Sequence, residues 1–102
     1  MSGLNFQTMP IIVTYDVPAR HVELKKCLFE KGYQDYIMHL DSKGVSRKIY
    51  LPNTTVYHPS KTAQEGRDDV QSCCKDLGID LERCVATVWS NWSAVWGKPF
   101  GK

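Results

Sequence analysis

The sequence predicts an α+β domain with a ferredoxin-like βαββαβ sandwich, in which one four-stranded antiparallel sheet carries two helices on one face. Two observations predict this fold class. Four segments have the β-branched or alternating composition of strands, and two segments between them repeat apolar residues at helical spacing. Each crossover from strand through helix to strand is expected to be right-handed, which places both helices on the same side of the sheet.

The length of the chain allows one domain. A chain of 102 residues suffices for a single hydrophobic core and is short for two. Its composition, 42% hydrophobic and 24% charged, excludes a disordered or fibrous protein. We expect a flexible leader at 1–8, the ferredoxin-like domain at 9–90 and a tryptophan-rich tail at 91–102.

The first strand and the first helix are expected at 11–16 and 19–31. The first of these segments reads Ile-Ile-Val-Thr-Tyr-Asp, which is typical of a central strand. Pro18 suits the first turn of the helix, and Gly32 is the residue type that ends helices. The expected buried stripe consists of Leu24, Cys27 and Leu28, with Val22 as a possible further member. The side chains expected to face water are Arg20, Glu23, Lys25, Lys26 and Glu30.

A hairpin is expected next, from strands at 33–40 and 47–51 joined by the turn sequence Asp-Ser-Lys-Gly at 41–44. Pro52 and Asn53 then interrupt the second of these strands. The strand must bend, bulge or lie at an edge there, since proline donates no hydrogen bond to a neighbouring strand. The β-type composition resumes at 54–57.

The second helix is expected at 63–77. Thr62 and Glu65 have the spacing of a capping box, and Gly78 provides the stop. The apolar or small residues within the helix fall at helical spacing and predict its buried face. The last strand is expected at 81–89.

The end of the chain is rich in tryptophan. Trp89, Trp92 and Trp96 are spaced i, i+3 and i+7, although a following glycine and proline allow no long helix. Together with Phe100, these side chains would leave a large apolar patch on a small monomer. The tail either folds back over the open face of the sheet or packs on a second subunit. We expect the second arrangement, in which these four residues form a homodimer interface.

Charge and cysteine content limit the class of protein. The net charge of +2 and the pI near 8.4 give no clustered basic signature of the kind that nucleic-acid-binding domains usually carry. The four cysteines show neither C-x-x-C nor zinc-type spacing, so we expect free thiols in a reducing compartment. No apolar run is long enough to cross a membrane, and the N-terminus has no signal-like pattern. We therefore expect a cytoplasmic protein.

Candidate chemistry is concentrated at two places. Asp16, at the end of the first strand, is a possible ligand for Mg²⁺ or Mn²⁺ and a candidate catalytic residue, and its alternative role is to cap the first helix. His58 is a candidate general acid or base. Asn53, Thr55 and Tyr57 would line a pocket with it at the strand irregularity. The alternative interpretation is that these polar groups satisfy a bulged backbone and a turn.

The segment Ile-Ile-Val-Thr-Tyr-Asp-Val-Pro at 11–18, with a helix that closes in Lys-Gly-Tyr at 31–33, resembles the opening of the Cas2 proteins of CRISPR systems. It also resembles their relatives, the VapD-type toxin ribonucleases. The resemblance implies a ferredoxin-like fold, a dimer, and an aspartate at the end of the first strand that binds a metal for phosphodiester cleavage in some members. Asp16 is the residue at that position.

Three functions remain open. We expect first a dimeric, non-catalytic module that binds nucleic acid or protein. The second is a metal-dependent endonuclease acting on RNA or DNA, in which Asp16 of each subunit positions a divalent ion. The third is a small-molecule enzyme or sensor with a pocket near 53–58, which requires a concave site between sheet and tail. The side chains expected to contact nucleic acid are Arg20, Lys25, Lys26, Arg47 and Lys48.

Overall fold

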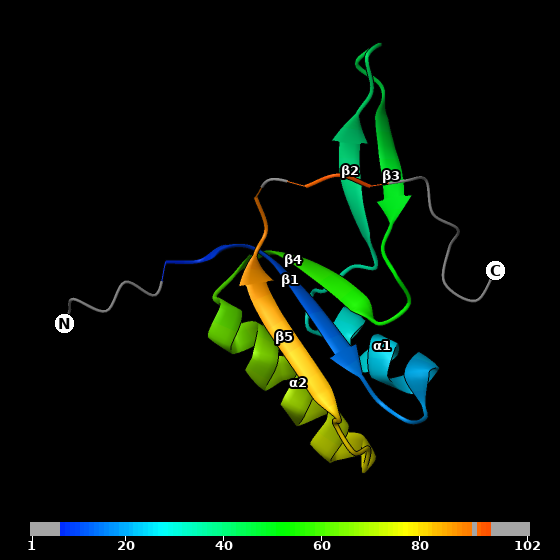
Figure 1. Ribbon diagram of the computed structural model, residues 1–102, viewed down its shortest axis with the longest axis vertical. Coiled ribbons are helices and arrows are strands. Elements are labelled where there is room, and N and C mark those ends of the chain that lie inside the picture. Colours follow the sequence, from blue (N-terminus) through cyan, green and yellow to red (C-terminus); the bar gives the residue numbers. More distant parts are fainter. Residues whose placement is uncertain (1–6, 91, 95–102) are drawn as a thin grey trace.

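The computed structural model describes residues 7–90 and 92–94 as five strands and two helices (Figure 1). The helix expected at 63–77 forms with those bounds, and the other expected segments form with shifted ends. In chain order they are β1 (Met9–Asp16), α1 (His21–Glu30), β2 (Tyr36–Leu40), β3 (Ser46–Tyr50), β4 (Thr55–Lys61), α2 (Ala63–Leu77) and β5 (Arg83–Val88).

The main sheet has three antiparallel strands in the order β4-β1-β5. The central place of β1 agrees with its apolar sequence. Ile11, Val13 and Tyr15 are buried on the face that the helices cover. The side chains between them in sequence lie on the opposite face, because successive strand residues alternate sides.

The expected four-stranded sheet is wrong, because β2 and β3 form a separate two-stranded sheet. Pro52 is the physical reason. The chain turns there, with the Thr55 amide donating to the Pro52 carbonyl at 2.9 Å, so the segment expected as one interrupted strand becomes β3 and β4 in different sheets. A single bridge between Gln34 and Tyr57 joins the base of the hairpin to β4, and the hairpin projects away from the main sheet (Figure 1).

Helix α2 packs directly on β1 and β5, as its sequence pattern predicts. The expected capping box is present, with Thr62 and Glu65 each accepting a hydrogen bond from the other's backbone amide. Gly66 faces the sheet, where an added Cβ would lie 2.7 Å from Cδ1 of Ile11. Gly78 ends the helix at φ 68°, a left-handed conformation that glycine adopts without strain.

Helix α1 packs against α2, and two expectations about it are wrong. Lys25 was expected to face water but is 2% exposed, whereas Val22 is 64% exposed. The expectation of free thiols also fails for two cysteines, because Cys27 and Cys73 form a disulfide between the helices. A local spacing rule misses this pair because 46 residues separate the two cysteines in sequence. Cys74 and Cys84 are free.

Arg20 precedes α1 in a left-handed conformation with φ 59°. Its side chain donates to the Leu77 carbonyl at 2.5 Å and pairs with Glu23 at 3.1 Å. The guanidinium therefore satisfies a carbonyl at the C-terminus of α2, where a positive charge is favourable. Within 7–90 and 92–94, neither helix has the length and apolar character that a membrane-spanning helix requires.

Candidate functional site

Asp16 lies where the sequence places it, at the end of β1, but its carboxylate is paired with Arg83. The two side chains meet at 2.5 Å and both are well exposed. The cap residue of α1 is Arg20, so Asp16 does not cap that helix either. The described residues bring no three His, Cys, Asp or Glu side chains together as a metal site. The Mg²⁺ or Mn²⁺ site therefore stays a prediction without geometric support.

The basic residues expected to hold nucleic acid do not form one surface. Arg20 is engaged at the end of α2 and Lys25 is buried, which removes both from a backbone-binding role. Lys26 is exposed on α1. Arg47 and Lys48 lie on β3, in the projecting hairpin. Of these five residues, Arg47 sits beside other features of a binding site, because its cross-strand partner His39 contacts Trp92.

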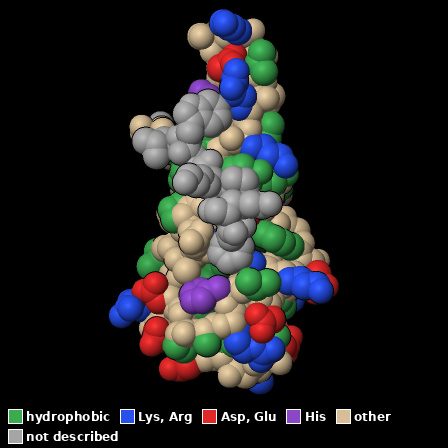
Figure 2. All heavy atoms as spheres, turned by 90° about the vertical axis from the view of Figure 1, so that its right-hand side faces the viewer, with side chains coloured by type: hydrophobic (Ala, Val, Ile, Leu, Met, Phe, Trp, Pro, Cys, Tyr) green, Lys and Arg blue, Asp and Glu red, His purple; other side chains and the backbone are tan. Residues whose placement is uncertain are grey.

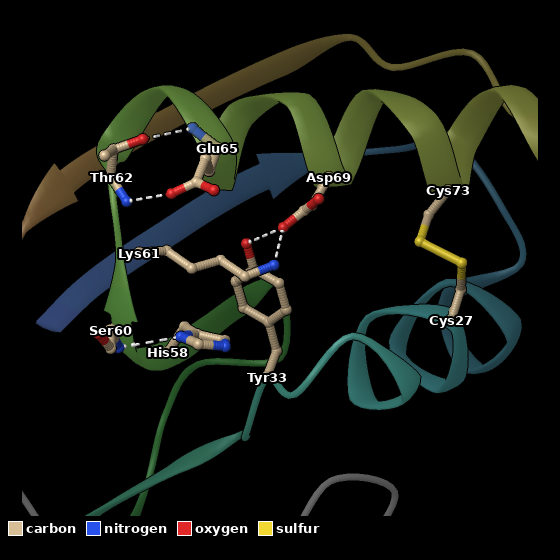
Figure 3. A network of polar contacts seen from close by, with 9 residues as sticks. All are labelled: Cys27, Tyr33, His58, Ser60, Lys61, Thr62, Glu65, Asp69 and Cys73. Atoms are coloured by element: carbon tan, nitrogen blue, oxygen red, sulfur yellow. Dashed lines mark hydrogen bonds and ion pairs between the residues drawn. A yellow bond between two sulfur atoms is a disulfide. The ribbon is translucent and has the colours of Figure 1, made fainter. Parts of the chain in front are cut away.

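His58 belongs to a polar network that joins β4, α2 and the loop after α1 (Figure 3). Its Nδ1 accepts from the Ser60 amide at 3.0 Å, and its ring contacts Tyr33 edge-on with centroids 5.1 Å apart. The other ring nitrogen faces Gly32, where an added Cβ would lie 3.0 Å away. Burial, followed by the nearby Lys61 ammonium, lowers the pKa of His58.

Asp69 is the acceptor at the centre of this network. Its carboxylate accepts hydrogen bonds from the Tyr33 hydroxyl at 2.7 Å and from the Lys61 ammonium. The ammonium also lies 5.0 Å from the centre of the Tyr33 ring. Burial and then the hydrogen bond to Asp69 raise the pKa of Tyr33 above its ordinary value. These groups satisfy one another, so the network holds three elements together and we assign it no catalytic role.

The expected pocket at 53–58 is not formed by the four residues proposed for it. Thr55 and Tyr57 lie on the face of β4 that is turned away from α2, because they pair with Thr14 and Ile12 of β1. His58 alternates to the other face, and Asn53 is exposed in the turn before β4. Tyr57 lines a concave site.

That site is a cleft of about 470 Å³ between the end of the main sheet, the base of the hairpin and the tail. Its walls come from four separate segments of the chain, and most of the lining side chains are apolar or aromatic. No Lys, Arg, Asp, Glu or His is among the described residues that line it. We call it the aromatic cleft, and its lining residues are Pro10, Gln34, Ile37, Met38, Tyr57, Pro59, Trp89, Ser90 and Trp92.

A row of rings leads from the cleft onto the hairpin. Trp89 and Trp92 are stacked, with centroids 5.5 Å apart and planes inclined by 22°. Trp92 meets His39 of β2 edge-on at 5.6 Å, and His39 is the cross-strand partner of Arg47. We call Trp89, Trp92, His39 and Arg47 the aromatic row. The expected subunit contacts of Trp96 and Phe100 lie outside the described residues.

The hairpin is more basic than the chain as a whole. Lys43, Arg47 and Lys48 are exposed on it, against one carboxylate, Asp41. Asp41 accepts from the amides of Lys43 and Val45 and from Arg47 at 3.0 Å, so it closes the turn and orients Arg47. Figure 2 shows Lys and Arg side chains along the projecting hairpin at the top of the molecule.

Sequence reasoning singled out Tyr57, Trp89, Trp92, Arg47 and Lys48, but it did not place them together. Gln34 received no role, and His39 was a candidate only for general acid–base chemistry, because the pairing of Gln34 with Tyr57 and the contact of Trp92 with His39 are tertiary facts. The available signal was the density of aromatic residues after 88 and of basic residues at 43–48.

No protein-family model, curated protein or solved structure matches the chain.

Proposed function

We propose that this protein is a non-catalytic module that binds single-stranded nucleic acid along the aromatic row. The observation that carries the proposal is the unbroken sequence of ring contacts from Trp89 through Trp92 to His39, ending beside Arg47 on a basic hairpin. Single-strand binders combine such rings, on which bases stack, with cations that follow the phosphates.

The charges of the hairpin support phosphate contacts more directly than the net charge of the chain does. Lys43, Arg47 and Lys48 are concentrated within six residues, and Asp41 lies two residues before this stretch. A single strand with unstacked bases fits this surface better than a duplex, because the rings need base faces to stack on. Arg47 therefore offers charge beside the stacked rings, whereas Lys48 lies on the opposite face of β3 with its ammonium over the Tyr36 ring.

The geometry gives less support to the other two functions. A nuclease centred on Asp16 needs a carboxylate available to a metal, and Asp16 is paired with Arg83. A small-molecule enzyme needs reactive groups in its pocket, and the described residues that line the aromatic cleft include no charged residue and no histidine. A protein partner is favoured by one observation, since Met38, Leu40 and Val45 on the hairpin are 50 to 65% exposed.

Homodimerisation, expected from the sequence, is part of this proposal. Strand β5 lies at the edge of the main sheet, and its Val85 is 62% exposed. An edge strand of this composition is a surface onto which another chain can add. Light scattering of the intact protein and of Val85→Lys tests it. We expect a dimer that the lysine weakens, and a monomer in both cases contradicts it.

A cytoplasmic location is likewise proposed, and the disulfide makes it testable. Cytosolic proteins seldom keep disulfides, since thiol systems there hold cysteines reduced. Rapid alkylation of cells followed by mass spectrometry reports the state of Cys27 and Cys73. We expect both to be alkylated in a cytoplasmic protein, and a protected pair contradicts that location.

Fluorescence anisotropy with a labelled oligo-dT of about 12 nucleotides tests the binding function. We expect affinity to fall steeply with salt, and Trp92→Ala to weaken it about tenfold or more, since stacking contributes roughly 1–3 kcal/mol per base. Arg47→Ala should reduce the salt slope by about 0.7. Arg67→Ala, on the exposed side of α2, is the matched control.

Two results contradict the proposal. One is the absence of oligonucleotide binding by a folded protein. The other is binding that neither responds to salt nor changes in the Trp92 and Arg47 variants. Salt-insensitive capture of a polypeptide that is lost on Leu40→Ser would instead favour the protein-binding interpretation, since Leu40 is 65% exposed on the hairpin.

A further inference from the structure

We propose that the aromatic cleft is an adenine-selective subsite, in which Gln34 reads the edge of one base of the bound strand. This inference rests on the proposed function, because the base reaches the cleft as part of a strand lying on the aromatic row. It adds a specificity that stacking alone does not provide, since every base has a face on which to stack.

The cleft and the row are continuous. Trp89 and Trp92 belong to both, so a base that leaves the stack at this point is directly above the cleft. The volume of about 470 Å³ lies within the range of sites that hold small organic ligands. The cleft therefore has room for a single base.

The lining favours an uncharged, flat group over a phosphate. The described residues that form the cleft carry no formal charge at neutral pH, and the nearest cations of the binding surface lie on the hairpin. Bases are uncharged, whereas every phosphate carries a negative charge. The separation of an apolar cleft from a basic hairpin thus matches the separation of base from backbone in a nucleotide.

Gln34 provides the recognition chemistry. Its side-chain Nε2 donates to the Tyr36 carbonyl at 3.1 Å, and Gln34 lines both the aromatic cleft and a neighbouring hollow that Tyr36 also lines. Among the described residues, Oε1 and the second N–H of this amide have no other hydrogen-bond partner. An acceptor and a donor held side by side complement N6 and N7 of adenine, the base that Gln reads by a bidentate contact.

The frame around Gln34 is rigid enough for such recognition. Its backbone exchanges two hydrogen bonds of 2.8 Å with Tyr57, which lines the same cleft. The preceding residue, Tyr33, is anchored to Asp69 (Figure 3). Specificity requires recognition groups that are positioned before the ligand arrives, and this segment is fixed on both sides of Gln34.

The test compares oligo-dT of about 12 nucleotides with the same strand carrying one central adenine, cytosine or guanine. We expect the adenine strand to bind about tenfold more tightly than the other three. Gln34→Leu should abolish that preference, so that the adenine strand binds no more tightly than oligo-dT, and Gln34→Glu should do the same by replacing the amide donor. Gln64→Leu, on the exposed face of α2, is the control. Urea unfolding of each variant confirms that it is folded.

Two further arms identify the source of the base. The corresponding RNA strands distinguish ribose from deoxyribose, and AMP alone tests whether a free nucleotide suffices. Binding of AMP as tight as that of the adenine strand would overturn a strand-borne base. Equal affinity for all four strands in the unaltered protein would overturn the subsite while leaving the proposed function intact. No binding of any strand would refute both.

Discussion

Reduction of the disulfide between Cys27 and Cys73 should destabilise the protein strongly. The bond closes a segment with a sequence separation of 46 residues and ties α1 to α2. Restricting the unfolded chain over a loop of this length is worth about 4 kcal/mol by the chain-entropy relation. Small domains unfold with a total free energy of about 5–15 kcal/mol, so this bond accounts for a large share of the stability.

Urea unfolding with and without a phosphine reductant measures the effect. With an m-value of about 1–2 kcal/mol/M, we expect reduction to lower the midpoint by roughly 2–4 M. Cys84→Ser is the matched control, because that thiol is free and only half-buried. Reductant should shift the midpoint of this variant as much as that of the unaltered chain.

Thiol counting provides the independent check. The chain has four cysteines, and the unreduced, unfolded protein should expose two thiols, those of Cys74 and Cys84. A count of four would show that the bond is absent. An unchanged urea midpoint after confirmed reduction would refute the loop-entropy reasoning itself.

Three further predictions concern the frame of the site. Gly66→Ala should lower the free energy of unfolding by about 1–2 kcal/mol, because overpacking against two β1 side chains outweighs the gain in helix propensity. Urea unfolding midpoints measure this loss, and Ser72→Ala is the control that should not destabilise the protein. Thr62→Ala should lower stability by about 1 kcal/mol through loss of the capping box, with helicity otherwise retained by circular dichroism. The lowered pKa of His58 means that the unfolded state takes up a proton first, so stability should fall as pH drops below about 6.5, and His58→Gln should flatten this dependence. Equal pH profiles for the two proteins would contradict the last prediction.

Local sequence signals identified the elements well where one residue type controls the backbone. The box at Thr62 and Glu65 set the start of α2, and Gly78 set its end. The apolar run of β1 indicated a central strand, which the pairing with β4 and β5 confirms. Such signals act within a few residues, so they are readable without the fold.

The sheet topology was predicted wrongly because the local sequence is compatible with more than one way of pairing the strands. Pro52 marks an interruption in any reading of the sequence, but only the tertiary structure decides that the chain turns there and sends β3 and β4 into different sheets. Burial of Lys25 on an amphipathic helix and the pairing of Cys27 with Cys73 are decided in the same way, by which faces meet.

The sequence by itself determined the α+β class, the two helices and the presence of an aromatic end. The site required the fold, because Gln34 pairs with Tyr57 and Trp92 reaches His39 across 23 and 53 residues of chain, the differences of their sequence numbers. Composition records which side chains are available for stacking and for charge. Their convergence on one cleft depends on long-range packing. The free energy of that packing is shared among many contacts, so no single sequence motif indicates it.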